Sequence, residues 1–492
     1  MTSQLPNPPR AICDSGELAG ATHHGVDAFF DIPYGTAQRF ALPSAPQRWQ
    51  GVRDATRPGP VFPQAPSRLS AVMGDTQGFS HQSEDAFTLN VWTPTSRTGA
   101  NNALPVLVWI HGGGWLTGGA PLDWYHGDAL ARSARAVVVS VNYRLGALGN
   151  LYLPGQTPGS MALHDLIAAL QWVGRNIGAF GGDASRITVC GQSAGAWYTA
   201  ALASSPLSRD LFSQAILLSL PGSIAPQTPD DAESLGRQFC AMLNVPADLG
   251  TLRQLPTAAL LDAQAGLART NPVFADIPPT FLPTISDALP EDLIGTLAAR
   301  GPALRLLIGT LPDEMGAFFS HDNRVKEAND ADTLARYQAC FGHHGAQRLA
   351  LRRRRAPELR NYDHLNRAVS DAIFREPTQR LARGLSSAGG DCFVYEFRYA
   401  SAMPDVGACH CFELPFLFGT FPAWAQAPMF SGLHLPQAMS VAADFQAAVL
   451  RFTETGDPNG DRLPSWPRYN GKAPIAMKFD QAPSTGTFTV DD

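Results

Sequence analysis

One pentad restricts the folds open to this chain more than any other feature. Residues Gly191 to Gly195 read Gly-Gln-Ser-Ala-Gly, after the apolar run 187–190 and before the small helix formers of 196–203. This order predicts a strand, a sharp turn and a helix, with Ser193 at the turn. Glycine is needed at both ends because side chains there would collide with neighbouring backbone. The exposed hydroxyl makes Ser193 a candidate nucleophile, although a chance glycine-serine turn has the same letters.

Short apolar runs alternate with helical patterns along the whole chain of 492 residues. Helices are expected over 160–177 and 438–455, from their apolar stripe and stop signals. Strands are expected at 87–92, 104–110, 136–141, 187–190, 215–219, 305–308, 392–397 and 475–479. The alternation predicts an α/β fold with a large, mostly parallel sheet and helices on both faces. With no repeat or linker to divide it, residues 1–492 are expected to form one domain, although chains above about 300 residues often form more.

Two stretches fit this pattern poorly. Residues 221–301 are rich in proline, and residues 320–383 are largely helical and contain four successive arginines at 352–355. Both are expected to be insertions above the carboxyl edge of the sheet, where they would wall a pocket. Peripheral packing is the alternative. The four arginines point to all sides of a helix, so a solvated helix is favoured over a docking patch.

Composition argues against several kinds of partner. A net charge of -6 does not suit nucleic-acid binding, and the apolar runs are far shorter than the roughly 18 residues that cross a bilayer. The first ten residues have three prolines and no apolar core of a secretory signal, so a cytoplasmic location is expected. Seven cysteines suit reduced thiols. The ligand spacing in Cys409-His410-Cys411 is too short for a structural zinc pair, so no metal is expected.

A glycine turn follows the strand predicted at 104–110. It reads His111-Gly112-Gly113-Gly114-Trp115, and such a turn can aim successive backbone N–H groups at one point, as an oxyanion hole requires. The N–H of Ala194, just after the candidate nucleophile, could be a third donor. Three glycines alone are weak support. Followed by the pentad, they stand in the order expected of an α/β-hydrolase.

A serine nucleophile needs a histidine base and a carboxylate that orients the base. In this fold the chain order is serine, acid, histidine. Asp313 and Glu314 follow the strand at 305–308, and His410 follows the strand at 392–397; spacing does not choose between the two acids. The competing histidines lack such a position, and they are His321, His343, His344, His364 and His434.

With these motifs the chain resembles the type B carboxylesterases, the family of bacterial para-nitrobenzyl esterases, animal carboxylesterases and cholinesterases. The similar segments extend over nearly the whole chain and are 83–92, 111–115, 141–144, 179–183, 191–195, 309–319, 407–418 and 455–460. The resemblance implies hydrolysis of carboxylic esters by water through an acyl-enzyme, without a cofactor. It also implies a triad of Ser193, Glu314 and His410, oxyanion donors at Gly113, Gly114 and Ala194, and scaffold ion pairs Arg39–Glu84 and Arg144–Asp165.

Three positions depart from the family pattern. Ala86 stands where secreted members have a disulfide cysteine, which agrees with the cytoplasmic expectation. Gln192 stands where the family has glutamate, so little preference for cationic substrates is expected. Leu220 and Pro221 stand where the family continues with serine and glycine, so the acyl pocket is expected to be reshaped.

The substrate is expected to be a small ester with uncharged, fairly apolar acyl or alcohol parts. Candidate pocket residues are Trp115, Gln192, Leu220, Phe274 and Phe318, although aromatic side chains are more often core than ligand wall. Hydrolysis of an amide or carbamate by the same triad is the nearest alternative. A non-catalytic binding protein is disfavoured because all three triad residues are present. The sequence does not indicate an oligomeric state.

Overall fold

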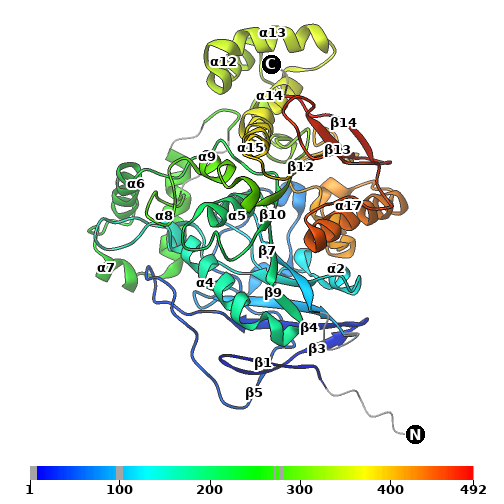
Figure 1. Ribbon diagram of the computed structural model, residues 1–492. Coiled ribbons are helices and arrows are strands. Elements are labelled where there is room, and N and C mark those ends of the chain that lie inside the picture. Colours follow the sequence, from blue (N-terminus) through cyan, green and yellow to red (C-terminus); the bar gives the residue numbers. More distant parts are fainter. Residues whose placement is uncertain (1–7, 96–102, 271–272, 277–280, 491–492) are drawn as a thin grey trace.

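A mixed β-sheet runs through the centre of the molecule (Figure 1). The computed structural model describes residues 8–95, 103–270, 273–276 and 281–490. In sheet order the strands are β14 (Ser484–Thr487), β13 (Ile475–Phe479), β12 (Cys392–Phe397), β11 (Arg305–Thr310), β10 (Gln214–Leu218), β9 (Gly182–Gln192), β7 (Leu104–Ile110), β8 (Val137–Val141), β6 (Thr88–Pro94), β4 (Val26–Pro33) and β3 (Ala21–His23). Neighbours from β13 to β8 pair in parallel, and the pairs outside them are antiparallel.

The strands predicted from the sequence are all confirmed, most of them within two residues. The largest difference is β9, which begins at Gly182 and pairs there with Leu104. The prediction missed β3, β4 and β14, together with the small separate sheet of β1 (Arg10–Cys13), β2 (Gly16–Ala19) and β5 (Val52–Asp54). Most of these are short edge strands with mixed polar residues, so they lack the continuous apolar run that marks a strand buried on both faces.

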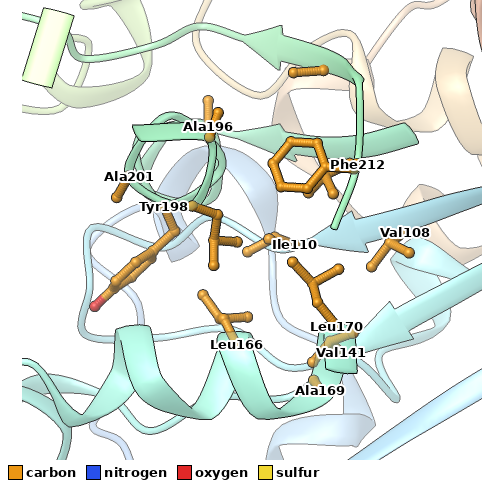
Figure 2. Packing of buried hydrophobic residues seen from close by; sticks show 14 of the residues in the cluster. Val108, Ile110, Val141, Leu166, Ala169, Leu170, Ala196, Tyr198, Ala201 and Phe212 are labelled. Carbon is orange, nitrogen blue, oxygen red and sulfur yellow. The ribbon is translucent and has the colours of Figure 1, made fainter. Parts of the chain in front are cut away.

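Helices cover both faces of the sheet, as predicted. Alternate residues of β7 point to opposite sides, so Val108 and Ile110 join one core cluster while Leu107 and Trp109 join another. The first cluster contains side chains of α4 (Met161–Asn176) and α5 (Ala194–Ser204), and Figure 2 shows Leu166, Leu170 and Ala196 of these helices in the same cluster as Val108 and Ile110. The second contains α17 (Leu435–Thr455), α2 (Asp128–Arg132) and α16 (Leu414–Phe418).

The helices predicted at 160–177 and 438–455 correspond to α4 and α17. Among the described residues before 221, the remaining α-helices are α1 (Ser70–Met73) and α3 (Gly146–Asn150). The stretch 221–301 contains α6 (Pro229–Met242), α7 (Leu249–Gln254), α8 (Thr257–Thr270) and α9 (Leu293–Ala298). After α10 (Gly316–Phe319), the stretch 320–383 contains α11 (Asn323–Lys326), α12 (Asp330–Phe341), α13 (Gly345–Arg355), α14 (Asn361–Ser370), the π-helical turn η6 (Asp371–Arg375) and most of α15 (Glu376–Ser387).

Two of these helices differ from the expectation. Helix α15 packs directly on β11 and β12, so the end of the second stretch covers the sheet. The arginine run at the end of α13 is also not fully solvated: Arg352 is buried and forms an ion pair with Asp371. Helices α12 and α13 pack on each other, and α12 packs on α14, at the top of Figure 1.

Both predicted ion pairs are confirmed. Arg144 and Asp165 are almost fully buried, with the Arg144 Nε and Nη2 atoms 2.8 and 2.6 Å from the two carboxylate oxygens. Arg39 donates to both oxygens of Glu84, with Nε to Oε2 at 2.8 Å. These bidentate contacts fix the guanidinium planes, and the first of them ties the segment after β8 to α4.

None of the described helices is both long and apolar enough to cross a membrane. All seven cysteines lie in the described part of the chain and are free thiols. In the same residues, no three histidine, cysteine or acidic side chains are grouped so that they could hold a metal ion.

Candidate active site

Ser193 stands at the junction of β9 and α5, where the strand, turn and helix predicted from the pentad are confirmed. Its backbone has φ 57° and ψ -124°, a strained conformation for a residue with a side chain. The turn is held by the Ser193 N–H, which donates to the Leu218 carbonyl at 2.9 Å. A Cβ atom on Gly195 would lie 2.1 Å from the Ile110 carbonyl oxygen, and one on Gly191 would lie 2.2 Å from that of Gly195. Only glycine fits at either position.

Glu314 and His410 form a buried pair at the carboxyl ends of β11 and β12. His410 Nδ1 lies 2.6 Å from Glu314 Oε2, and both side chains are at most 2% exposed. The other Glu314 oxygen accepts the Leu311 N–H at 2.9 Å. Asp313 points elsewhere: its carboxylate accepts the Ala408 N–H at 3.2 Å, and burial raises its pKa. The acid that faces the histidine is therefore Glu314, as the resemblance implied.

The second ring nitrogen of His410 contacts Gln192. The Gln192 Nε2 atom lies 3.2 Å from His410 Nε2 and 3.4 Å from the Cys411 sulfur. Because Nδ1 donates its proton to Glu314, Nε2 is free to accept, and it accepts from the amide. Among the described residues the Ser193 hydroxyl has no hydrogen bond to His410, although the two side chains line one cavity. Catalytic contacts of this kind often tighten only when substrate binds.

The turn after β7 carries the proposed oxyanion donors. Gly113 has φ 116°, and a Cβ atom there would lie 1.9 Å from the Thr117 carbonyl oxygen. Within the described chain, the N–H groups of Gly113, Gly114 and Ala194 have no protein acceptor, so they are available to a ligand. The Tyr143 hydroxyl, which donates to the His111 carbonyl at 2.7 Å, braces the start of the turn.

His111 itself is a structural residue. It is buried against the Tyr143 ring at a centroid distance of 4.4 Å, and burial lowers its pKa to about 4. Its Nδ1 atom lies 2.8 Å from the Gly112 carbonyl oxygen. A neutral imidazole therefore donates this hydrogen bond and holds the turn.

A cavity of about 230 Å³ opens onto Ser193 and His410. Trp115, Gln192 and Phe318 line it, as predicted. The other described lining residues are Ala65, Pro66, Ser67, Arg68, Leu69, Met73, Phe79, Gly112, Gly113, Gly114, Leu116, Thr117, Gly118, Trp124, Tyr125, Pro221, Ile224, Gln264, Ala265, Ala268, Phe374 and Cys411.

Two predicted wall residues do not line this cavity. Leu220 is fully buried in the core cluster that contains α4 and α5, so its side chain fills the protein interior. Phe274 packs against a separate cluster around α14 and η6. The sequence prediction missed Phe374 of η6, whose ring lies 5.1 Å from the His410 ring, and Arg68 in the loop before α1. Neither has a local pattern that marks a pocket residue.

The elbow serine, the buried acid and histidine pair and the glycine turn all lie at the carboxyl ends of parallel strands. This arrangement defines the class of α/β-hydrolase enzymes. The chain belongs to the carboxylesterase family, whose family model matches residues 9–490. It is a serine-type carboxylic ester hydrolase.

Relatives over nearly the full length agree with this assignment. A phenmedipham hydrolase of Pseudarthrobacter oxydans is 33% identical over 95% of this chain and 94% of its own. A protein named as a probable N-octanoylanthranilate hydrolase of Rhodococcus erythropolis is 34% identical over 94% and 96%, and the para-nitrobenzyl esterase of Bacillus subtilis is 32% identical over 94% and 93%.

Solved structures give the same fold. A carboxylesterase of Geobacillus stearothermophilus superposes with a TM-score of 0.85 at 30% identity and covers 97% of both chains. A para-nitrobenzyl (PNB) esterase superposes with a TM-score of 0.85 at 29% identity, over 98% of this chain and 97% of its own. The predicted α/β-hydrolase fold and family are therefore confirmed.

Proposed function

We propose that Ser193, His410 and Glu314 hydrolyse a small carboxylic ester through an acyl-enzyme. One observation supports this most: the 2.6 Å contact between His410 and Glu314 lies behind a cavity that also opens onto Ser193 and the glycine turn. A buried carboxylate at Nδ1 keeps the proton there, which leaves Nε2 as the base.

The reaction then has two halves. His410 Nε2 takes the Ser193 proton as the hydroxyl attacks the ester carbonyl, and the negative oxygen of the tetrahedral intermediate is bound by the N–H groups of Gly113, Gly114 and Ala194. His410 returns the proton to the departing alcohol. Water, activated by the same nitrogen, then releases the acid from Ser193. For His410 to accept the proton, the hydrogen bond from the Gln192 amide to His410 Nε2 must break when substrate binds.

The acyl part of the substrate is apolar in this proposal. Trp115, Ile224, Phe318 and Phe374 supply an apolar wall beside Ser193, and such walls bind ester chains by burial of apolar area.

We also propose that the chain is one catalytic domain in which stretches 221–301 and 320–383 help to wall the pocket. Ile224, Gln264 and Phe374 in the lining come from these stretches. The cytoplasmic location stays a prediction from the sequence.

A second candidate is hydrolysis of an amide or carbamate by the same residues. It is favoured by two relatives, one named a phenmedipham hydrolase and one named a probable N-octanoylanthranilate hydrolase. The acyl-transfer steps are shared, and only protonation of the leaving nitrogen differs.

Hydrolysis of para-nitrophenyl butanoate tests the proposal. We expect a pre-steady-state release of nitrophenolate equal to one per enzyme where deacylation is slower than acylation, and Ser193→Ala should lower kcat by roughly 10⁶-fold. A Ser193→Ala variant as active as the wild type would reject the mechanism. The kcat/KM ratio of this ester and its matched nitroanilide distinguishes esterase from amidase.

A further inference from the structure

Arg68 brings a positive charge to the wall of the active-site cavity. It lies in the loop before α1, its side chain is accessible, and it lines the cavity together with Ser193 and His410. The Arg68 Nη2 atom lies 2.8 Å from the point where a Cβ atom of Gly114 would stand. The guanidinium is therefore next to the glycine turn, close to the place of the ester carbonyl.

No protein carboxylate balances this charge in the part of the chain that the structure describes. The described lining residues include no aspartate or glutamate, and among the described ion pairs and hydrogen bonds Arg68 has no partner. The buried arginines differ: Arg144 pairs with Asp165, and Arg375 pairs with Asp371 and Glu396. Surrounding protein lowers the pKa of Arg68 by desolvation. Because Arg68 is accessible and has no partner among the described residues, its N–H donors are free to bind an anion that enters the cavity.

The neighbours of Arg68 place it on the leaving-group side. Leu69, Met73, Tyr125 and Cys411 share one cluster, and Gln192 connects Cys411 to His410 Nε2. His410 Nε2 returns its proton to the leaving oxygen, so the leaving group lies beside this cluster.

The acyl group is assigned to the part of the cavity wall formed by Ile224. There Ile224 packs against the core cluster that contains α5, and its carbonyl accepts the Trp197 indole N–H at 2.8 Å. With the acyl chain against Ile224, the leaving group is the part of the substrate directed toward Arg68 in this proposal.

We propose that Arg68 binds a carboxylate on the leaving group, so that the enzyme prefers esters of apolar acids with carboxylate-bearing alcohols or phenols. The proposal rests on the function proposed above, and it departs from the expectation, drawn from the sequence, of an uncharged substrate. A guanidinium binds a carboxylate through two parallel N–H donors. The neutral amide of Gln192 fits this preference, because a glutamate at that position would repel the same carboxylate.

Two matched esters test the proposal. In 3-carboxyphenyl butanoate the carboxylate is held away from the ester, and 3-carbamoylphenyl butanoate is its uncharged isostere. Hydrolysis of the first adds one water and releases butanoate and 3-hydroxybenzoate. We expect kcat/KM of the wild type to favour the carboxylate ester by about 10- to 100-fold, the range of a charge-assisted hydrogen bond. Arg68→Gln should abolish this ratio, and Arg68→Lys should keep part of it.

Arg57→Gln is the matched control. Arg57 is an exposed arginine outside the cavity lining, so its loss changes the net charge equally and should keep the preference. A wild type that favours the carbamoyl ester, or an Arg68→Gln variant that keeps the carboxylate preference, would overturn the proposal. The proposed mechanism is tested separately with the carbamoyl ester, which the wild type should hydrolyse and Ser193→Ala should not.

Discussion

Replacing Glu314 by glutamine tests the role of the buried carboxylate. Glutamine has nearly the same shape but only one acceptor oxygen, whereas Glu314 accepts from His410 Nδ1 at 2.6 Å and from the Leu311 N–H at 2.9 Å. If the glutamine oxygen stays with Leu311, its NH₂ group faces His410 and forces the ring proton onto Nε2. That tautomer cannot accept the Ser193 proton. If the amide turns over, its NH₂ group instead opposes the Leu311 N–H inside the protein, which leaves a buried donor unsatisfied.

The first arrangement keeps more hydrogen bonds, so we expect kcat to fall by about 10⁴-fold, the effect of a wrong histidine tautomer in a serine triad. At 1.36 kcal/mol for each factor of ten, this corresponds to about 5 kcal/mol of transition-state stabilisation. The assay is kcat for para-nitrophenyl butanoate, with the thermal midpoint as a check on folding. Asp313→Asn is the matched control, because Asp313 accepts from Ala408 and does not face His410; it should lower kcat less than tenfold. A folded Glu314→Gln enzyme within tenfold of the wild type would refute the reasoning.

Three further changes address the surroundings of the site. Gln192→Glu places a carboxylate at the 3.2 Å contact with His410 Nε2, so the acid limb of the kcat/KM profile should move to higher pH; an unmoved limb would contradict this contact. Asp165→Ala leaves Arg144 buried without its partner, so the free energy of unfolding, measured in urea, should fall by about 3 to 5 kcal/mol. A decrease of less than about 1 kcal/mol would contradict this prediction. Burial, with the Glu314 charge adding to it, raises the pKa of Glu413 above its usual 4.5, so the unfolded carboxyl loses its proton at lower pH than the folded one. The stability of Glu413→Gln relative to the wild type should therefore increase from pH 4 to pH 7, whereas a constant difference would count against a neutral Glu413.

Local chemistry explains why much of this site was predictable. The Ser193 turn and the glycine turn each depend on a few consecutive residues, and their backbone angles and close contacts explain the glycines directly. Strands buried on both faces are equally visible as apolar runs. The choice of Glu314 over Asp313 was not local: both follow the same strand, and only the orientation of the loop after β11 decides which one faces His410.

The cavity wall was less predictable because distant segments build it. Leu220 and Phe274 are apolar residues near suitable positions in sequence, but their side chains pack into core clusters. Phe374 reaches His410 from a π-helical turn, and Arg68 reaches Gly114 from an irregular loop. Such contacts follow from how the loops fold over the sheet, which residue type and spacing do not specify.

Covalent trapping tests the central claim most directly. A phosphonate ester with an apolar substituent mimics the tetrahedral intermediate and transfers its phosphonyl group to an activated serine. After digestion and mass spectrometry, the account predicts one phosphonyl group per chain, on the peptide that contains Ser193, with activity lost in proportion to labelling. Inactivation with the label on any other residue, or full activity in a chain labelled at Ser193, would contradict it.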